Sequence, residues 1–132
     1  MRLAILPVVV ATVALAAPAG ATCNLSEVCS DIGDSLIGTV IQDGLSPGVQ
    51  RVRLEWMSDS EQPGALAAYQ LSRCDSSTCQ PIVNVLPVGS CGSDQAYTYI
   101  DQPPAPVRRW SYRLDVLRVD GVVACSARVV PR

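Results

Sequence analysis

Large apolar residues alternate with polar residues over the central part of the chain. The clearest stretch covers residues 49–56, where Val52, Leu54 and Trp56 fall on one face and charged residues fall on the other. The same spacing groups further bulky residues: Tyr69 with Leu71, Tyr97 with Tyr99, and Trp110 with Tyr112 and Leu114. Spacing with a period of two places bulky side chains on one face of a β-strand. The pattern predicts a β-sandwich.

Segments rich in glycine, proline and polar residues divide the chain into seven predicted strands. They cover residues 36–42, 49–56, 66–73, 80–86, 96–100, 110–119 and 122–130. Pro81 lies in the fourth strand, which suits the edge of a sheet because proline donates no ladder hydrogen bond. Residues 58–64 and 89–95 are predicted loops. Asp120-Gly121, between the last two strands, is the strongest hairpin signal in the chain.

The first 21 residues have the pattern of a signal peptide. Met1-Arg2 gives a short basic start, an apolar run follows over residues 3–17, and a small-x-small cleavage signal stands at Ala19-Gly20-Ala21. The run is shorter than the roughly twenty residues that a membrane span needs. We expect cleavage after Ala21 and a secreted protein, extracellular or periplasmic, that is not embedded in a membrane. A retained N-terminal anchor helix is the alternative.

The expected mature chain begins with a short cysteine-containing segment, residues 22–35, and continues as one β domain over residues 36–132. Asn24 followed by Glu27 resembles a capping box, and apolar residues at helical spacing precede Gly33. We therefore expect a short helix over residues 25–32 that stops at Gly33. Asn24 also begins a glycosylation sequon, but the cap is the preferred interpretation.

The expected mature chain contains six cysteines, namely Cys23, Cys29, Cys74, Cys79, Cys91 and Cys125. An even number behind a signal peptide predicts three disulfides formed in an oxidising compartment. Cys74 and Cys79 enclose a turn-rich tetrapeptide between two strands, so we expect them to bond to each other. Zinc is the rival interpretation, but it needs about four converging thiolates. Only one closely spaced cysteine pair is present, without any histidine.

The other four cysteines are assigned from the expected topology. Cys91 precedes the fifth strand and Cys125 lies on the last, near opposite edges of the sandwich. A disulfide requires a Cα separation under about 7 Å, which these two are not expected to meet. We therefore expect Cys23 and Cys29 each to bond one of Cys91 and Cys125. The alternative is a local bond between Cys23 and Cys29.

Composition excludes several classes of function. The chain has no histidine and no lysine, so Ser-His-Asp, Cys-His, Ser-Lys and Schiff-base chemistry cannot arise within it. The expected mature chain has nine arginines against twelve acidic residues, a net charge of −3. Nucleic acid and anionic membranes are bound through clustered positive charge, so both are disfavoured as partners. We expect no enzyme activity and no cofactor.

Two polar segments remain as candidate sites. Asp59 and Glu61 could form a carboxylate pair or offer oxygen ligands to calcium, but they lack the regular spacing of a calcium loop, so a solvated turn is favoured. Arg108-Arg109-Trp110 could dock an anionic sugar or a peptide carboxylate, because arginine supplies bidentate hydrogen bonds and tryptophan a stacking face. Trp110 suits the core equally well at the start of its strand, and we favour the core.

The order of these landmarks resembles a fibronectin type III domain. Leu54-Glu55-Trp56 resembles the family's second-strand tryptophan, and Tyr69-Gln70-Leu71 resembles its third-strand tyrosine. The likeness covers residues 36–130 and is closest to short versions in bacterial exported proteins, where a Cys-x4-Cys turn like residues 74–79 also occurs. The resemblance implies an all-β, seven-stranded immunoglobulin-like sandwich of one three-stranded and one four-stranded sheet. Here that sandwich would carry a short disulfide-tethered N-terminal helix.

The chain also departs from the family pattern. Trp110 stands where the family's tyrosine corner is expected, so the corner is lost or Tyr112 replaces it. Residues 118–121 lack the Arg-Gly-Asp of integrin-binding members, so we carry over no adhesion site. The N-terminal helix and its cysteines lie outside the family pattern.

Because one fold hosts many roles, the resemblance favours binding without naming a ligand. The leading hypothesis is a non-enzymatic interaction module that recognises a protein or polysaccharide of the cell envelope or extracellular space through loops or a strand edge. A second is a structural subunit of an extracellular assembly. A third is an inhibitor of a secreted hydrolase that presents the rigid loop of residues 74–79.

Overall fold

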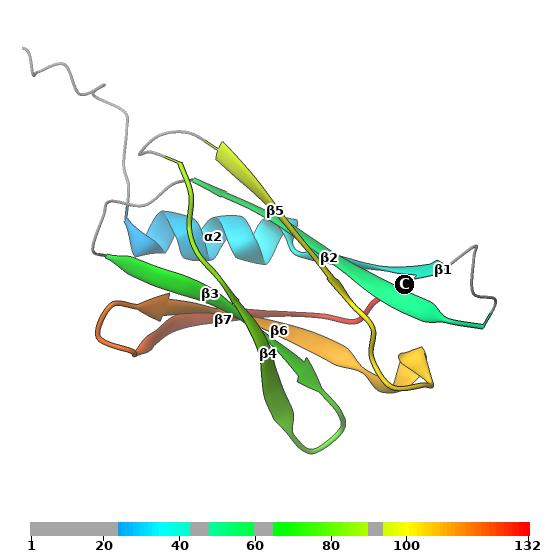
Figure 1. Cartoon of the computed structure of the whole chain (residues 1–132). Coiled ribbons are helices and arrows are strands. Elements are labelled where there is room, and N and C mark those ends of the chain that lie inside the picture. Colours follow the sequence, from blue (N-terminus) through cyan, green and yellow to red (C-terminus); the bar gives the residue numbers. More distant parts are fainter. Residues whose placement is uncertain (1–23, 43–47, 60–64, 90–93) are drawn as a thin grey trace, which may run out of the picture.

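The computed structural model describes residues 24–42, 48–59, 65–89 and 94–132. These ranges contain one α-helix, one 3-10 helix and seven strands: α2 (Leu25–Ser35), β1 (Ile37–Gln42), β2 (Gln50–Asp59), β3 (Leu66–Cys74), β4 (Cys79–Val85), β5 (Asp94–Asp101), η2 (Val107–Arg109), β6 (Ser111–Arg118) and β7 (Val123–Val129). The strands form two antiparallel sheets, β1-β2-β5 and β4-β3-β6-β7, which face each other (Figure 1). The predicted signal peptide, Cys23 and Cys91 lie outside the described residues.

Each predicted strand is present, but several boundaries were wrong. β2 continues to Asp59, and β5 begins at Asp94 rather than Ala96, because residues 56–59 and 94–97 pair with each other along the ladder. Ser58, predicted in a loop, is therefore a buried strand residue. Backbone pairing therefore extends these strands beyond the apolar residues from which they were predicted.

The helix also extends further than predicted. Its N-terminus is confirmed, because the side-chain oxygen of Asn24 accepts a hydrogen bond from the Glu27 amide at 2.9 Å. Gly33 does not stop it, and α2 ends at Ser35. Leu36 then has an extended backbone and leads directly into β1. Entry into the sheet, rather than glycine, ends this helix.

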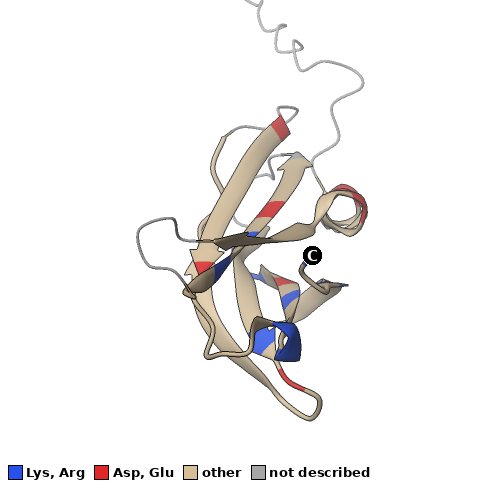
Figure 2. Cartoon of the chain, turned by 90° about the vertical axis from the view of Figure 1, so that its right-hand side faces the viewer, with Lys and Arg blue, Asp and Glu red and all other residues tan. Residues whose placement is uncertain are grey.

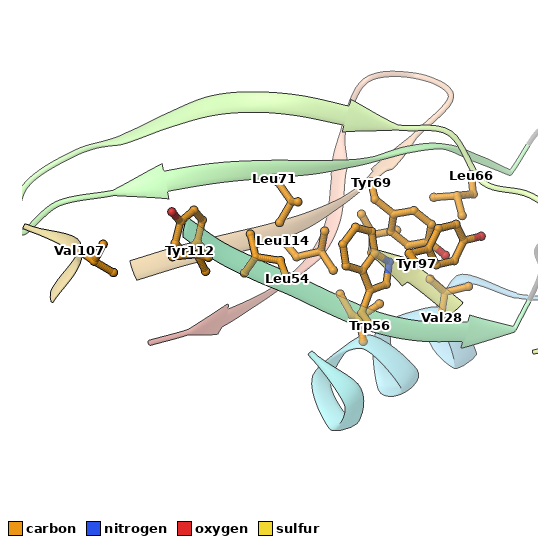
Figure 3. Packing of buried hydrophobic residues seen from close by; sticks show 13 residues of the cluster. Val28, Leu54, Trp56, Leu66, Tyr69, Leu71, Tyr97, Val107, Tyr112 and Leu114 are labelled. Atoms are coloured by element: carbon orange, nitrogen blue, oxygen red, sulfur yellow. The ribbon is translucent and has the colours of Figure 1, made fainter. Parts of the chain in front are cut away.

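The core lies between the sheets and is largest where three aromatic rings meet. Trp56 stacks on Tyr97 with ring centroids 5.4 Å apart, and Tyr69 contacts both rings at 5.6 and 4.9 Å (Figure 3). Val52, Leu54 and Trp56 are all buried, which confirms the predicted inward face of β2. Contacts of this kind contribute beyond the burial of apolar area.

The helix belongs to the same core. Val28 and Ile32 are 1% and 0% exposed and pack in one cluster with Trp56 and Leu66. Figures 1 and 3 show α2 running beside β2, on the side where the chain then enters β1. The segment predicted as an N-terminal addition therefore fills part of the sandwich interior.

One long side of the sandwich, which we call the joined side, connects β1 of one sheet with β7 of the other. The disulfide Cys29–Cys125 links α2 to β7. Beyond β7, Arg132 donates its amide to the Gly38 carbonyl at 3.1 Å and accepts from the Val40 amide at 2.9 Å. The Ser35 hydroxyl accepts from the Met57 amide at 2.9 Å, which gives β2 a hydrogen-bond partner just before β1 begins at Ile37. This side is closed by backbone, side-chain and covalent links.

The opposite long side, which we call the free side, holds the outer strands β4 and β5. β4 contains Pro81 and lies at the edge of its sheet, as predicted. The Cys74–Cys79 disulfide closes the turn between β3 and β4, again as predicted. At the end of β6, Gly121 has φ +85° and its amide donates to the Arg118 carbonyl, which confirms the predicted hairpin.

Candidate binding surface

A buried carboxylate joins the two sheets from within. Asp101, at the end of β5, is 5% exposed and accepts hydrogen bonds from Arg73 of β3 and from the Tyr112 hydroxyl of β6. Arg73 donates through Nε at 2.9 Å and through Nη2. Burial and Asp101 raise the pKa of Tyr112, and the hydrogen bond to Asp101 raises the pKa of Arg73. Tyr112 and Arg73 therefore keep their protons at neutral pH, and the network is structural.

Trp110 adjoins this network and is fixed in place. It precedes β6, which begins at Ser111, and is partly buried against the core. Its indole Nε1 donates to the Pro104 carbonyl at 2.7 Å. The guanidinium carbons of Arg73 and Arg109 lie 5.7 and 5.3 Å from its ring centroid. The predicted packing of Trp110 against the core is confirmed, and its ring also contacts the guanidinium groups of Arg73 and Arg109.

Arg108 and Arg109 lie on η2 at the end of the molecule where β5 finishes (Figure 2). Both are exposed, and neither forms an ion pair with another residue of the described ranges. A surface hollow of about 390 Å³ lies at the same end. It is lined by Gly48, Val49, Gln50, Gln102, Pro103, Pro104, Ala105 and Val107.

The β3–β4 turn is rigid and polar. One carboxylate oxygen of Asp75 accepts from the backbone amides of Ser77 and Thr78, each at 2.8 Å. These two amide hydrogen bonds are the main cause that lowers the pKa of Asp75 to about 2, and the charge of Arg109 makes a smaller contribution to the same shift. The carboxylate is thus ionised and occupied by its own turn.

A second hollow, of about 290 Å³, lies between this turn and the outer face of the four-stranded sheet. It is lined by Asp75, Ser76, Ser77, Thr78, Cys79, Arg113 and Arg128. Arg113 of β6 lies directly opposite Arg128 of β7. Arg113 forms an ion pair with the buried carboxylate of Asp115 at 3.1 Å.

The other predicted pair lies elsewhere. Asp59 ends β2 opposite Asp94, at the far end of the β2–β5 ladder from Asp101, and Glu61 lies outside the described residues. The structure therefore does not bring Asp59 together with Arg108 and Arg109. A small hollow of about 180 Å³ near Asp94 also contains Asp31 and Asp34. Within the described ranges, no group of histidine, cysteine and acidic residues is placed to hold a metal ion.

The disulfide prediction is confirmed for the bonds that can be seen. Cys74 bonds Cys79, and Cys29 bonds Cys125, so the local Cys23–Cys29 alternative is wrong. A bond between Cys23 and Cys91 stays a prediction. The sequence did not indicate the Arg113–Arg128 pair, because its members are 15 positions apart and only the register of β6 and β7 brings them together.

Comparisons with known protein families and proteins do not identify a family for this chain. A scan against protein-family models and a search of curated proteins find no match to it. Among the described helices, none combines the length and apolarity needed to cross a bilayer.

Proposed function

We propose that this protein is a non-enzymatic, exported interaction module with a fibronectin type III-like sandwich, and that it binds a protein or an envelope polysaccharide. The division into sheets of three and four strands supports the fold assignment, since the resemblance implies the same division. The signal-peptide pattern and the two disulfides support export to an oxidising compartment.

The observation that carries the binding role is the uneven distribution of unpaired positive charge. Arg108 and Arg109 lie on η2 at one end of the molecule (Figure 2). The hollow of about 390 Å³ is lined by Val107 of η2, and the hollow of about 290 Å³ is lined by Asp75, whose pKa the charge of Arg109 helps to lower. In Figure 2 the acidic part of α2 lies apart from η2. An exposed cationic surface attracts an anionic ligand, and binding residues commonly lie on exposed segments that a rigid scaffold holds in place.

Retention on cell-envelope material tests this function. The oxidised protein is passed over an immobilised envelope fraction of its producing cells, at low and high salt. The double variant R108Q/R109Q is compared with R118Q, because Arg118 already pairs with Asp120 at 2.8 Å and lies on the β6–β7 hairpin. We expect salt-sensitive retention of the wild type and of R118Q, and weaker retention of the double variant.

Absence of retention, or equal retention of all variants, would contradict the proposed role of this end. The second candidate function is that of a structural subunit, and the native mass of the free protein distinguishes it from a binding module. That candidate is favoured by the outer strands β4 and β5 and by exposed apolar residues near them, Leu86, Val88 and Ile100. A mass that grows with concentration would favour the subunit, because edge strands pair readily with other chains.

A further inference from the structure

The outer face of the four-stranded sheet contains an arrangement that its own residues do not explain. Arg113 and Arg128 occupy directly opposite positions on β6 and β7. Like charges at such positions destabilise a sheet, since their side chains are close neighbours. A pair of this kind is tolerated more easily when negative charge lies between its members.

The protein supplies that charge to only one of the two arginines. Arg113 donates from Nε to Asp115, which is itself buried and also accepts from the Ser126 hydroxyl. Arg128 contacts the Cys79 sulfur at 3.8 Å and has no carboxylate within ion-pair distance among the described residues. One positive charge therefore remains uncompensated at the hollow.

Asp75 lines the same hollow but forms no ion pair with Arg128. Its Oδ1 is occupied by the amides and hydroxyls of Ser77 and Thr78, at 2.8 to 3.4 Å. The Cys74–Cys79 disulfide closes the turn, and the amides of Ser77 and Thr78 hold the Asp75 carboxylate against it. The hollow thus combines a fixed turn on one wall with guanidinium groups on the other.

The lining also defines the kind of ligand. It consists of hydroxyl-bearing side chains, one carboxylate, a disulfide sulfur and two guanidiniums, and it contains no aliphatic or aromatic side chain. Protein interfaces are anchored by buried aromatic and apolar side chains, which this hollow could not receive. Its volume of about 290 Å³ is at the lower end for ligand sites and suits one small polar ring with its substituents.

We infer that this hollow binds the carboxylate of a uronic acid residue in an acidic polysaccharide, with Arg128 as the principal contact and Arg113 as the second. The inference rests on the proposed binding function and narrows its ligand to acidic saccharides. The guanidinium groups take the carboxylate, and Ser76, which also lines the hollow, offers its hydroxyl to the ring hydroxyls. Arg113 remains fixed by Asp115 through Nε, and its Nη groups would donate to the ligand.

The experiment uses the oxidised full-length secreted protein and a galacturonate trimer, with isothermal titration for affinity and amide NMR shifts for location. A galactose trimer of equal length removes only the carboxylates, and a hexa-aspartate peptide supplies carboxylates without sugar rings. R128Q is the test variant, because Arg128 is exposed and leaves no carboxylate behind. R118Q is the matched control, since it removes the same charge at the opposite end of β6.

We expect the galacturonate trimer to bind, with shifts confined to residues 75–79 and the neighbourhood of Arg113 and Arg128. R128Q should lower its affinity about tenfold, the loss of one charge-assisted contact, whereas R118Q should change it less than about twofold. Binding should also weaken with salt, because the site is at the surface.

Three results would overturn the inference. They are shifts centred on η2 instead of the turn, equal affinity of wild type and R128Q, and equal or tighter binding of the peptide or the neutral trimer. Each leaves the envelope-retention assay unaffected. Failure of this site with continued retention therefore rejects the uronate hollow alone, and loss of retention in every variant rejects the binding function itself.

Discussion

The two long sides of the sandwich hold their sheets together by different means. On the joined side, α2, the Cys29–Cys125 disulfide and the strand-like pairing of Arg132 with β1 connect the sheets directly. On the free side, β4 and β5 are outer strands, and the link between sheets runs through the interior, from Asp101 to Arg73 and Tyr112. Links between the sheets are thus concentrated on one side, and the outer strands β4 and β5 lie on the other.

The largest expected difference concerns the two disulfides. The Cys29–Cys125 bond spans 96 positions and the Cys74–Cys79 bond spans 5. Each bond stabilises the fold by lowering the entropy of the unfolded chain. The loop lengths give about 4.7 kcal/mol for the first bond and about 2 kcal/mol for the second. We expect C29S/C125S to lower the free energy of unfolding by clearly more than C74S/C79S, as measured by urea denaturation. Equal losses of unfolding free energy in the two variants would show that the Cys29–Cys125 bond does not stabilise the fold more than the Cys74–Cys79 bond.

The next effect concerns the helix as a core element. Ile32→Ala should cost about 2–5 kcal/mol, because the side chain is fully buried and leaves a cavity. Ile37→Ala is the matched control in the adjacent strand, since Ile37 is 53% exposed and should cost less than about 1 kcal/mol. Thermal and chemical unfolding measure both variants. A small cost for Ile32→Ala would mean that α2 merely covers the sandwich.

The interior link of the free side is probed by Tyr112→Phe. This change removes one hydrogen bond to the side chain of Asp101, which also pairs with Arg73, and retains the ring, so we expect a loss of about 1.5–3 kcal/mol. Tyr97→Phe is the comparison, because the Tyr97 hydroxyl accepts from the uncharged Val88 amide at 3.1 Å. Its loss should be about 1 kcal/mol. A larger loss of stability in Tyr97→Phe than in Tyr112→Phe would show that the Tyr112–Asp101 hydrogen bond does not join the sheets.

A smaller effect concerns Ser35, whose hydroxyl continues the β1 edge. Ser35→Ala removes its hydrogen bonds with Met57 and should cost about 1 kcal/mol. On the free side, Asn84→Ala removes an exposed hydrogen bond from Gln70 and should cost less than about 0.5 kcal/mol. Hydrogen exchange of the Met57 amide gives a second measurement, and unchanged protection in Ser35→Ala would exclude this role.

The smallest effect is the pH dependence of the turn. The pKa of Asp75 is lowered from its ordinary value of 3.8 to about 2 in the folded protein. A lowered folded pKa means that the ionised carboxylate stabilises the fold above about pH 4, and that this stabilisation is lost as the pH falls towards 2. Asp75→Asn should flatten that part of the stability curve. A carboxyl that titrates near 4 by NMR would contradict the turn geometry.

Much of the fold could be predicted because its signals are local. Period-two alternation located each strand, Asn24 marked the helix start, and the short spacing of Cys74 and Cys79 indicated their bond. Strand ends were missed because they depend on whether a neighbouring strand offers hydrogen bonds. Gly33 illustrates the same limit, since α2 continues through this glycine to Ser35, whose hydroxyl bonds the Met57 amide of β2.

The candidate surface was predicted only in part. Arg108 and Arg109 were evident as the one adjacent basic pair, and they are exposed as the binding hypothesis requires. Arg113 and Arg128 were missed, because single arginines on alternating strands are ordinary solvent-facing residues until the register places them opposite each other. Asp101 gave no signal, since a carboxylate at a strand end is usually solvated.

The sequence by itself determined the alternation that forms strands, the turn and cap residues, and the exclusion of histidine- and lysine-based chemistry, all of which depend on residue type and near neighbours. Only the tertiary structure decided that α2 completes the core, that Cys29 bonds Cys125 and that Asp101 joins two sheets. These features depend on sheet order and register, which arise from the simultaneous burial of residues far apart in the chain. The arginine-lined hollow belongs to the second group for the same reason.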